Sequence, residues 1–190
     1  MNQVWLPPAE YYATLPKQIA SAGVIFRDTE GRVLLVEPTY GAETWELPGG
    51  GLDGGESPWA GARREIKEEL GFDLLPGRLL VVDWVPPQPD GRPALTNNLF
   101  DGGVLDDDQI AALRLADGEL KRSKFATRDE AAGMLRPHMA RRVAVCLDVV
   151  DTGRTAYLEN GFDPRPSSSF AAGSARAGGG STRVSSGPLP

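Results

Sequence analysis

The chain has 190 residues and a formal net charge of −6, with a composition ordinary for a globular protein apart from its high glycine and proline content. That length suits one domain with a sizeable core, and the negative charge argues against binding of nucleic acid through net charge. The single cysteine, Cys146, excludes an intrachain disulfide and favours a reducing cytoplasm, and no apolar run of membrane-spanning length and no signal peptide is visible.

The first 18 residues are rich in proline and aromatic residues, and we expect residues 1–18 to form an N-terminal arm ahead of the main domain. The side chains of Trp5, Tyr11 and Tyr12 would anchor this arm either on the domain itself or on a second subunit. The sequence leaves both arrangements open, so it permits a homodimer.

The domain is predicted to begin with strands. Residues 19–27 and 32–37 are mostly apolar and suit two strands, with a polar turn at 28–31 between them. Residues 44–47 give a third, short strand, because Pro48 and the glycines that follow it end the pattern.

Residues 58–70 carry the signals of a helix. Ser57 suits the N-cap, Pro58 suits the first helical position, and Gly71 suits the C-terminal stop. At about 100° per residue, four apolar side chains share one stripe. We assign this stripe to the core: Trp59, Ala62, Ile66 and Leu70.

The second half of the domain combines strands with helices. Strands are predicted around the apolar run 79–82 and at 95–105 and 120–126, with helices at 127–135 and 137–150. Proline and glycine make 86–91 a loop, Thr127 suits a helix N-cap, and Cys146 is expected in the core.

This order of elements predicts an α/β domain over residues 19–162, with a mixed β-sheet between helices. Residues 163–190 differ in kind, because more than half of them are Gly, Ser or Pro. Such a composition cannot bury enough apolar surface to order itself, so we predict a disordered tail there.

Three carboxylates gather on the helix predicted at 58–70. Glu65, Glu68 and Glu69 fall at i, i+3 and i+4, so they crowd one face and repel one another. A divalent cation such as Mg²⁺ would neutralise them, because it prefers oxygen ligands. Arg64 lies four residues before Glu68 and can pair with it. A solvated helix face is the plain alternative for three glutamates alone.

The wider pattern is far more specific. Gly50, Glu56 and the run REIKEELGF from Arg64 to Phe72 have the spacing of the Nudix signature, and the chain resembles the Nudix (MutT-type) hydrolases. Phe72 departs from the pattern, since the family more often has an aliphatic residue there. The preceding letters WELPGG also look like the usual lead-in of that family. The resemblance implies a Nudix-like αβα sandwich, with the signature helix beside the mixed sheet.

The resemblance also implies roles for individual residues. Glu68 and Glu69 would be metal ligands, Glu65 would be a ligand or the general base toward water, and Arg64 would orient these carboxylates. The backbone carbonyl of Gly49 would be a further ligand. The implied cofactor is Mg²⁺ or Mn²⁺, since clustered carboxylates holding metal ions can neutralise phosphate charge and activate water.

The general base has a second possible source, since some family members use an acidic residue well beyond the signature helix. Glu119, just before the strand predicted at 120–126, is the first candidate here, and the acidic run 106–108 is the second. Both are also readily explained as surface charge.

The residues that would hold a nucleotide are less defined. Tyr40, Trp45 and Trp84 could each stack on a base, although aromatic residues more often serve as core or scaffold. We expect His138 to be a surface or cap residue. Pro87 lies at a position associated in the family with ADP-ribose hydrolysis, but three prolines in this loop make one such match uninformative.

The resulting hypothesis is a metal-dependent hydrolase of a phosphoanhydride bond in a nucleoside diphosphate linked to another group. ADP-ribose-like compounds, nucleoside triphosphates and dinucleoside polyphosphates stay open as substrates. One alternative is a catalytically silent nucleotide-binding or regulatory module on the same fold, although such relatives typically lose a signature glutamate. Another is an isoprenoid diphosphate isomerase, which needs a cysteine in the site, and Cys146 lies on a predicted C-terminal helix.

Overall fold

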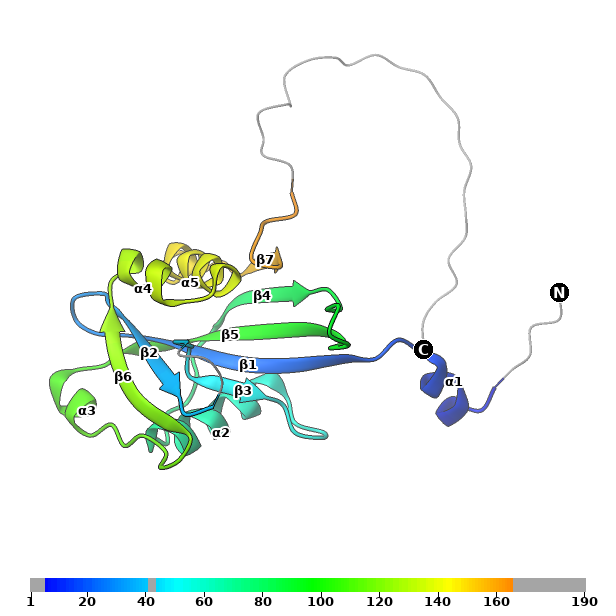
Figure 1. The fold of residues 1–190 in the computed structure, drawn as a ribbon, viewed down its shortest axis with the longest axis horizontal. Coiled ribbons are helices and arrows are strands. Elements are labelled where there is room, and N and C mark those ends of the chain that lie inside the picture. The colour runs from blue at the N-terminus through cyan, green and yellow to red at the C-terminus, as the bar shows by residue number, and fades with distance from the viewer. Residues whose placement is uncertain (1–5, 41–43, 166–190) are drawn as a thin grey trace, which may run out of the picture.

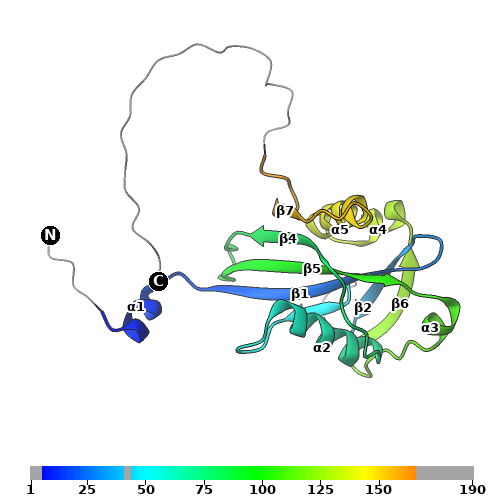
Figure 2. The ribbon, with the colours of Figure 1, turned by 180° about the vertical axis from the view of Figure 1, so that it is seen from behind.

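The computed structural model describes residues 6–40 and 44–165, and within them a mixed β-sheet lies between two layers of helices (Figures 1 and 2). The α/β class and the sandwich of helices about a mixed sheet are confirmed. Helix α2 covers one face of the sheet, and α4 and α5 cover the other. The strands are β1 (Gln18–Arg27), β2 (Val33–Pro38), β3 (Gly49–Gly51), β4 (Leu79–Val85), β5 (Ala94–Val104), β6 (Leu120–Ala126) and β7 (Ala156–Glu159). The helices are α1 (Pro8–Thr14), α2 (Pro58–Leu70), α3 (Asp107–Ala111), α4 (Arg128–Met134) and α5 (Pro137–Val149).

The sheet is organised around β1. The strand order is β6-β2-β1-β5-β4-β7, and the short β3 pairs with β1 off this path. Strand β1 runs parallel to β5 along its whole length and antiparallel to β2 and β3. The glycine strand β3 is therefore fixed on the central strand of the sheet, directly before the loop that leads into α2.

Successive side chains of the central strands point to opposite faces of the sheet, so the domain has two hydrophobic cores. Side chains of β1 and β2 that point to one face, such as Val24 and Leu34, pack with Ile66 and Leu70 of α2. Their neighbours on the other face pack with Cys146 and other residues of α5. Each face of the sheet thus gains a covering helix, which is the burial that a two-sided apolar sheet requires.

The helix predicted at 58–70 is confirmed to the residue. The Ser57 hydroxyl accepts a hydrogen bond from the Ala60 N–H, and Gly71 ends the helix with φ of 74°. The placement of Trp59 in the core is wrong, since this side chain is 39% exposed. It lies in the first turn, where its indole N–H donates to the carbonyl of Pro76 at 2.8 Å, so its polar edge determines its position.

The strand predicted at 44–47 is also wrong. Trp45 and Glu46 form only isolated bridges, and the paired segment is the glycine run β3. Gly49 has φ of 138°, and a Cβ atom there would lie 2.2 Å from the carbonyl oxygen of Ala22. Only glycine permits this close approach of the two backbones, which propensity scales for strands do not anticipate.

Most other elements match the prediction within one or two residues. Strand β6 is confirmed exactly, Thr127 caps α4 through a complete capping box, and Cys146 is buried. Helix α3, strand β7 and helix α1 were not predicted. Helix α1 buries none of its residues, and Tyr11 and Tyr12 remain about half exposed while their rings contact each other edge to face.

Two predicted features fall partly beyond the described residues: Trp5, and the tail from residue 166 onward. In the described part of the chain, no helix is long and apolar enough to cross a membrane.

Candidate active site

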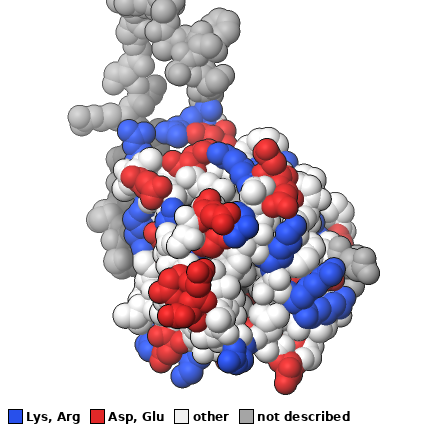
Figure 3. Space-filling model, turned by 90° about the vertical axis from the view of Figure 1, so that its left-hand side faces the viewer, with Lys and Arg blue, Asp and Glu red and all other residues white. Residues whose placement is uncertain are grey.

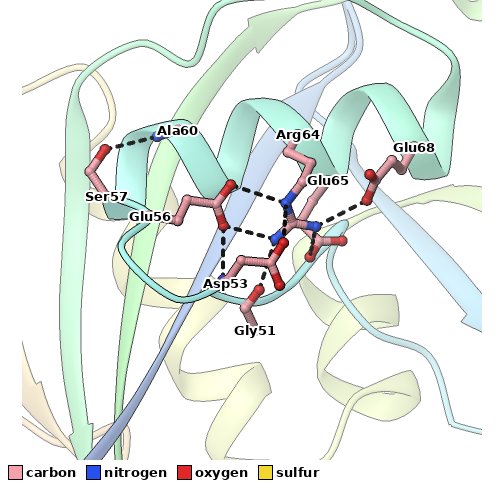
Figure 4. Close-up of polar contacts among 8 residues, drawn as sticks. All are labelled: Gly51, Asp53, Glu56, Ser57, Ala60, Arg64, Glu65 and Glu68. Carbon is pink, nitrogen blue, oxygen red and sulfur yellow. Dashed lines mark hydrogen bonds and ion pairs between the residues drawn. The ribbon is translucent and has the colours of Figure 1, made fainter.

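Arg64 is the centre of a polar network on α2 (Figure 4). Its Nη1 donates to Glu65 at 2.8 Å and to Glu68 at 3.0 Å. Its Nε and Nη2 donate to the two carboxylate oxygens of Glu56, at 3.0 and 2.9 Å, and Nη2 also donates to the carbonyl of Gly51. One guanidinium therefore links the loop before the helix to two of the three clustered glutamates, because its fork of donors serves several acceptors at once.

Glu69, in the last turn of α2, is held by the glycine strand and not by Arg64. Its Oε2 accepts a hydrogen bond from the backbone N–H of Gly49 at 2.8 Å. Burial raises the pKa of Glu69 to about 8, and the neighbouring carboxylates of Glu65, Glu119 and Glu46 contribute to the shift, while the Gly49 N–H opposes it. Within residues 6–40 and 44–165, Glu69 therefore has no ion pair with a cationic side chain.

Glu65 lies between these two arrangements. Burial raises its pKa, with further contributions from the charges of Glu68 and Glu119, against the opposing effect of Arg64. Its carboxylate packs directly on the glycine strand, since a Cβ atom on Gly50 would lie 2.5 Å from Glu65 Oε1. The glycine at position 50 thus leaves the space that this carboxylate occupies.

The oxygen donors of this cluster suit a hard divalent cation, which prefers carboxylate ligands. Two half-buried or buried carboxyl groups, Glu65 and Glu69, repel each other, so a cation between them would lower both pKa values. As placed, however, no three acidic, histidine or cysteine side chains of the described residues converge closely enough to enclose an ion. Arg64 contacts Glu65 and Glu68 instead, so their carboxylates would have to reorient toward a metal.

Glu119 is exposed and lies just before β6. Its backbone carbonyl accepts from the N–H of Thr39, and its charge raises the pKa values of both Glu65 and Glu69. The fold thus brings Glu119 near the carboxylates of α2 although fifty residues separate them. In the run 106–108, Asp106 has a structural role instead, because it caps α3 in a capping box with Gln109.

The three aromatic residues predicted to stack on a base lie in different settings. Tyr40 is 69% exposed, the Trp45 ring lies 5.3 Å from the guanidinium of Arg122, and Trp84 belongs to β4. None of them lines either of the two cavities described below. Their role in base stacking stays a prediction.

A cavity of about 640 Å³ opens beside the glycine strand. It is lined by β1, by residues 46–52 and by side chains from β5 and α5, including Asn97 and Arg142. A second cavity of about 270 Å³ continues from it toward the start of α5 and the loop between β4 and β5. The two share six lining residues, so they form one groove: Ile19, Glu46, Leu95, Asn97, Met139 and Arg142.

A buried ion pair forms the floor of this groove. Arg142 donates through Nε and Nη2 to one oxygen of Asp83, at 2.7 Å each, and the other oxygen accepts from the N–H of Gly161. Asn97 donates to the backbone carbonyl of Asp83 and accepts from the hydroxyl of Ser21. These polar groups satisfy one another, so the floor is rigid and electrically balanced.

Three groove residues were not predicted from the sequence: Glu46, Asn97 and Arg142. His138, predicted to be a surface or cap residue, lies in the first turn of α5, lines the second cavity and is partly buried. Burial lowers its pKa, as do the positive charges of Arg142, Arg136 and Arg141.

Cys146 lies apart from the clustered glutamates. It is fully buried in α5, and burial raises the pKa of its thiol. The charged groups that act on it are Arg142, Asp101 and Asp83, none of which belongs to the α2 cluster. This location argues against a reaction that needs a cysteine beside the glutamates.

Comparison with known proteins agrees with this geometry. A model of the NUDIX domain matches residues 17–146. The protein named Putative ADP-ribose pyrophosphatase YjhB, of Bacillus subtilis, is 44% identical over 72 residues, which cover 35% of this chain and 33% of that protein. The RNA pyrophosphohydrolase of Psychrobacter cryohalolentis is 38% identical over 68 residues, which cover 35% of this chain and 39% of that protein. The matches thus span between a third and two fifths of these relatives' length.

Among solved structures, the MutT protein of Methanosarcina mazei superposes with a TM-score of 0.58 at 24% identity, covering 72% of this chain and 97% of that one. At this level of identity the likeness shows the fold. The matched segment includes β1, the glycine strand and α2, which are the elements that position the clustered carboxylates.

Proposed function

Because the NUDIX model covers 130 of its 190 residues, the chain belongs to the NUDIX domain family, and we propose that it hydrolyses a phosphoanhydride bond in a nucleoside diphosphate linked to another group. The observation that carries this proposal is the contact between the signature helix and the glycine strand. Glu69 accepts from the Gly49 N–H and Glu65 packs on Gly50, so two half-buried carboxylates contact the glycine strand, and that strand lines the groove.

Glu65, Glu68 and Glu69, with the backbone carbonyl of Gly49, would hold the divalent cation, Mg²⁺ or Mn²⁺. Such a cation supplies neutralisation of phosphate charge and acidification of a bound water. Arg64 holds Glu65 and Glu68 before substrate arrives, and the Gly49 N–H fixes Glu69. Positioning of this kind accounts for most of the catalysis that phosphoryl transfer requires.

We assign the general base to Glu119. In the described residues its carboxylate has no hydrogen-bond partner, and its exposure makes it accessible to water. Glu65, the other candidate, already accepts from Arg64 and is confined by Gly50, which suits a ligand better.

The substrate is proposed as a small nucleotide derivative. The two relatives are named for ADP-ribose and for RNA, and both names denote cleavage of a pyrophosphate. On the face shown in Figure 3 acidic and basic side chains are interspersed, without a continuous basic surface that would favour a long nucleic acid. The free, buried cysteine is in keeping with a cytoplasmic location, and the exposed aromatic residues of α1 with a homodimer.

The experiment is a phosphate-release assay on a panel of nucleotides with Mg²⁺, with Mn²⁺ and with chelator. The panel holds ADP-ribose, NADH, diadenosine polyphosphates, and normal and oxidised nucleoside triphosphates. Turnover of at least one class with metal and none with chelator supports the hydrolase. A protein that binds metal and nucleotide but turns over nothing would contradict it and favour the silent binding module.

A further inference from the structure

The groove beyond the glycine strand has a defined direction. It starts where Gly49 contacts Glu69, runs along β1 and β5, and ends at Arg136 and His138 near the start of α5. Its two parts, of about 640 and 270 Å³, are together large enough for the part of a nucleotide that extends beyond its phosphates.

Most polar groups along this groove already have partners within the protein. Arg142 is paired with Asp83, Asn97 with Ser21 and the Asp83 carbonyl, Arg92 with Asp90, and Gln88 with the Pro86 carbonyl. These groups shape the groove and have little capacity left for a ligand.

Glu46 is different. It is partly buried, lines both parts of the groove, and lies at their junction. Its backbone is fixed by two hydrogen bonds with Val36, yet its carboxylate has no hydrogen bond or ion pair with any residue in 6–40 or 44–165. The positive charge of Arg136 acts on this carboxylate, but Arg136 forms no hydrogen bond or ion pair with it. A partly desolvated carboxylate without a hydrogen-bond donor is costly, which indicates a ligand that donates hydrogen bonds.

The order of groups in a nucleotide identifies that donor. With the phosphates at the carboxylates of α2 and the base in the more distant part of the groove, the sugar lies between them. Glu46 lines the groove where its two parts meet, three residues before Gly49, whose N–H binds Glu69. The two hydroxyl groups of ribose are neighbouring donors, and in dinucleotide sites an acidic side chain binds the ribose 2′-hydroxyl in the same way.

We propose that Glu46 binds the 2′- and 3′-hydroxyl groups of the substrate and so selects ribonucleotides over deoxyribonucleotides. This inference rests on the proposed function, because it takes the α2 carboxylates as the phosphate end. It narrows the substrate class, since deoxynucleoside triphosphates leave the Glu46 carboxylate unpaired and would be disfavoured.

The test measures binding, so that it does not depend on turnover. The dissociation constants of AMP, 2′-deoxy-AMP and 2′,3′-dideoxy-AMP are determined by calorimetry with Mg²⁺ for the wild type, Glu46→Gln and Glu46→Ala. Glu10→Ala serves as the control, because Glu10 is an exposed carboxylate on α1 that lines neither part of the groove. Circular dichroism verifies that each variant is folded.

Wild type and Glu10→Ala should bind AMP about 10- to 100-fold more tightly than the dideoxy nucleotide, as expected for hydrogen bonds to a charged group. In Glu46→Ala this ratio should fall to about one, with Glu46→Gln between the two because its amide keeps one acceptor. A wild-type ratio near one, no binding of AMP, or a ratio retained in Glu46→Ala would each overturn the inference. If the phosphate-release assay shows turnover while the sugar makes no difference, only the role of Glu46 fails. If turnover is absent, the proposed function itself fails.

Discussion

The N–H of Gly49 donates a hydrogen bond to the carboxylate of Glu69 at 2.8 Å, across twenty residues of sequence. This contact joins the glycine strand to the last turn of the signature helix. Gly49 also pairs with Gly23 of the central strand β1. The position of the Glu69 carboxylate is therefore linked through β3 to the centre of the sheet.

Substitution of Gly50 by alanine tests whether the glycine strand determines the position of Glu65. The new Cβ atom would lie 2.5 Å from Glu65 Oε1, so the carboxylate must move. We expect turnover to fall by about 10- to 100-fold, since a misplacement of about 1 Å has that effect. Gly54→Ala is the matched control, because a Cβ atom there meets nothing within 4 Å. Equal activity of the two variants would show that the packing on Gly50 is not needed.

Glu119→Gln tests the assignment of the general base. Loss of a general base lowers turnover by about 100- to 10,000-fold and should remove the acidic limb of the pH–rate profile. Asp117→Asn, two residues earlier and also exposed, is the comparison, and its profile should keep the wild-type shape. Full activity of Glu119→Gln would move the role to Glu65.

Binding of a divalent cation should stabilise the fold. Burial and the neighbouring carboxylates raise the pKa values of Glu65 and Glu69, and a cation bound between them would offset that cost. A ligand that binds only the folded state adds its binding free energy to stability. At saturating Mg²⁺ the melting temperature should rise by roughly 5 °C. Matched ionic strength in KCl controls for screening. The double variant Glu65→Gln, Glu69→Gln should show little shift, and an undiminished shift would place the metal elsewhere.

The ion pairs of Glu37 should account for part of the stability that the fold loses at low pH. The hydrogen bond from Arg122 lowers the pKa of this buried carboxyl group below its usual value of 4.5, and Lys121 contributes. A lowered pKa gives stability that is present above about 4.5 and lost as the pH falls through the folded-state value. Denaturation between pH 3 and 6 should therefore show a steeper acid loss for wild type than for Glu37→Gln. Parallel curves would mean that Glu37 does not contribute.

Local signals made helix α2 predictable. Ser57, Pro58 and Gly71 mark its ends, and the spacing of Glu65, Glu68 and Glu69 places them on one face without knowledge of the fold. The capping residues and the spacing of the glutamates both lie within the helix and its flanking residues, so they can be recognised without any contact between distant segments.

The groove was not predictable, because it depends on contacts between distant segments. Arg142 and Asp83 are 59 residues apart, and neither has a local pattern that announces a buried pair. Glu46 becomes a candidate ligand-binding residue only when the structure shows its carboxylate in the groove without a hydrogen-bond partner among the described residues. The exposure of Trp59 was also not predictable, because its indole N–H donates to the carbonyl of Pro76, which lies outside its helix.

The most direct test of the account is turnover of the best substrate of the panel by Glu69→Gln, beside wild type and the exposed-carboxylate control Glu10→Gln. The amide keeps the size of the side chain but removes its charge, so we expect turnover to fall by about two to four orders of magnitude while the variant stays folded. Wild-type turnover by a folded Glu69→Gln would contradict the placement of the reaction at the carboxylates of α2.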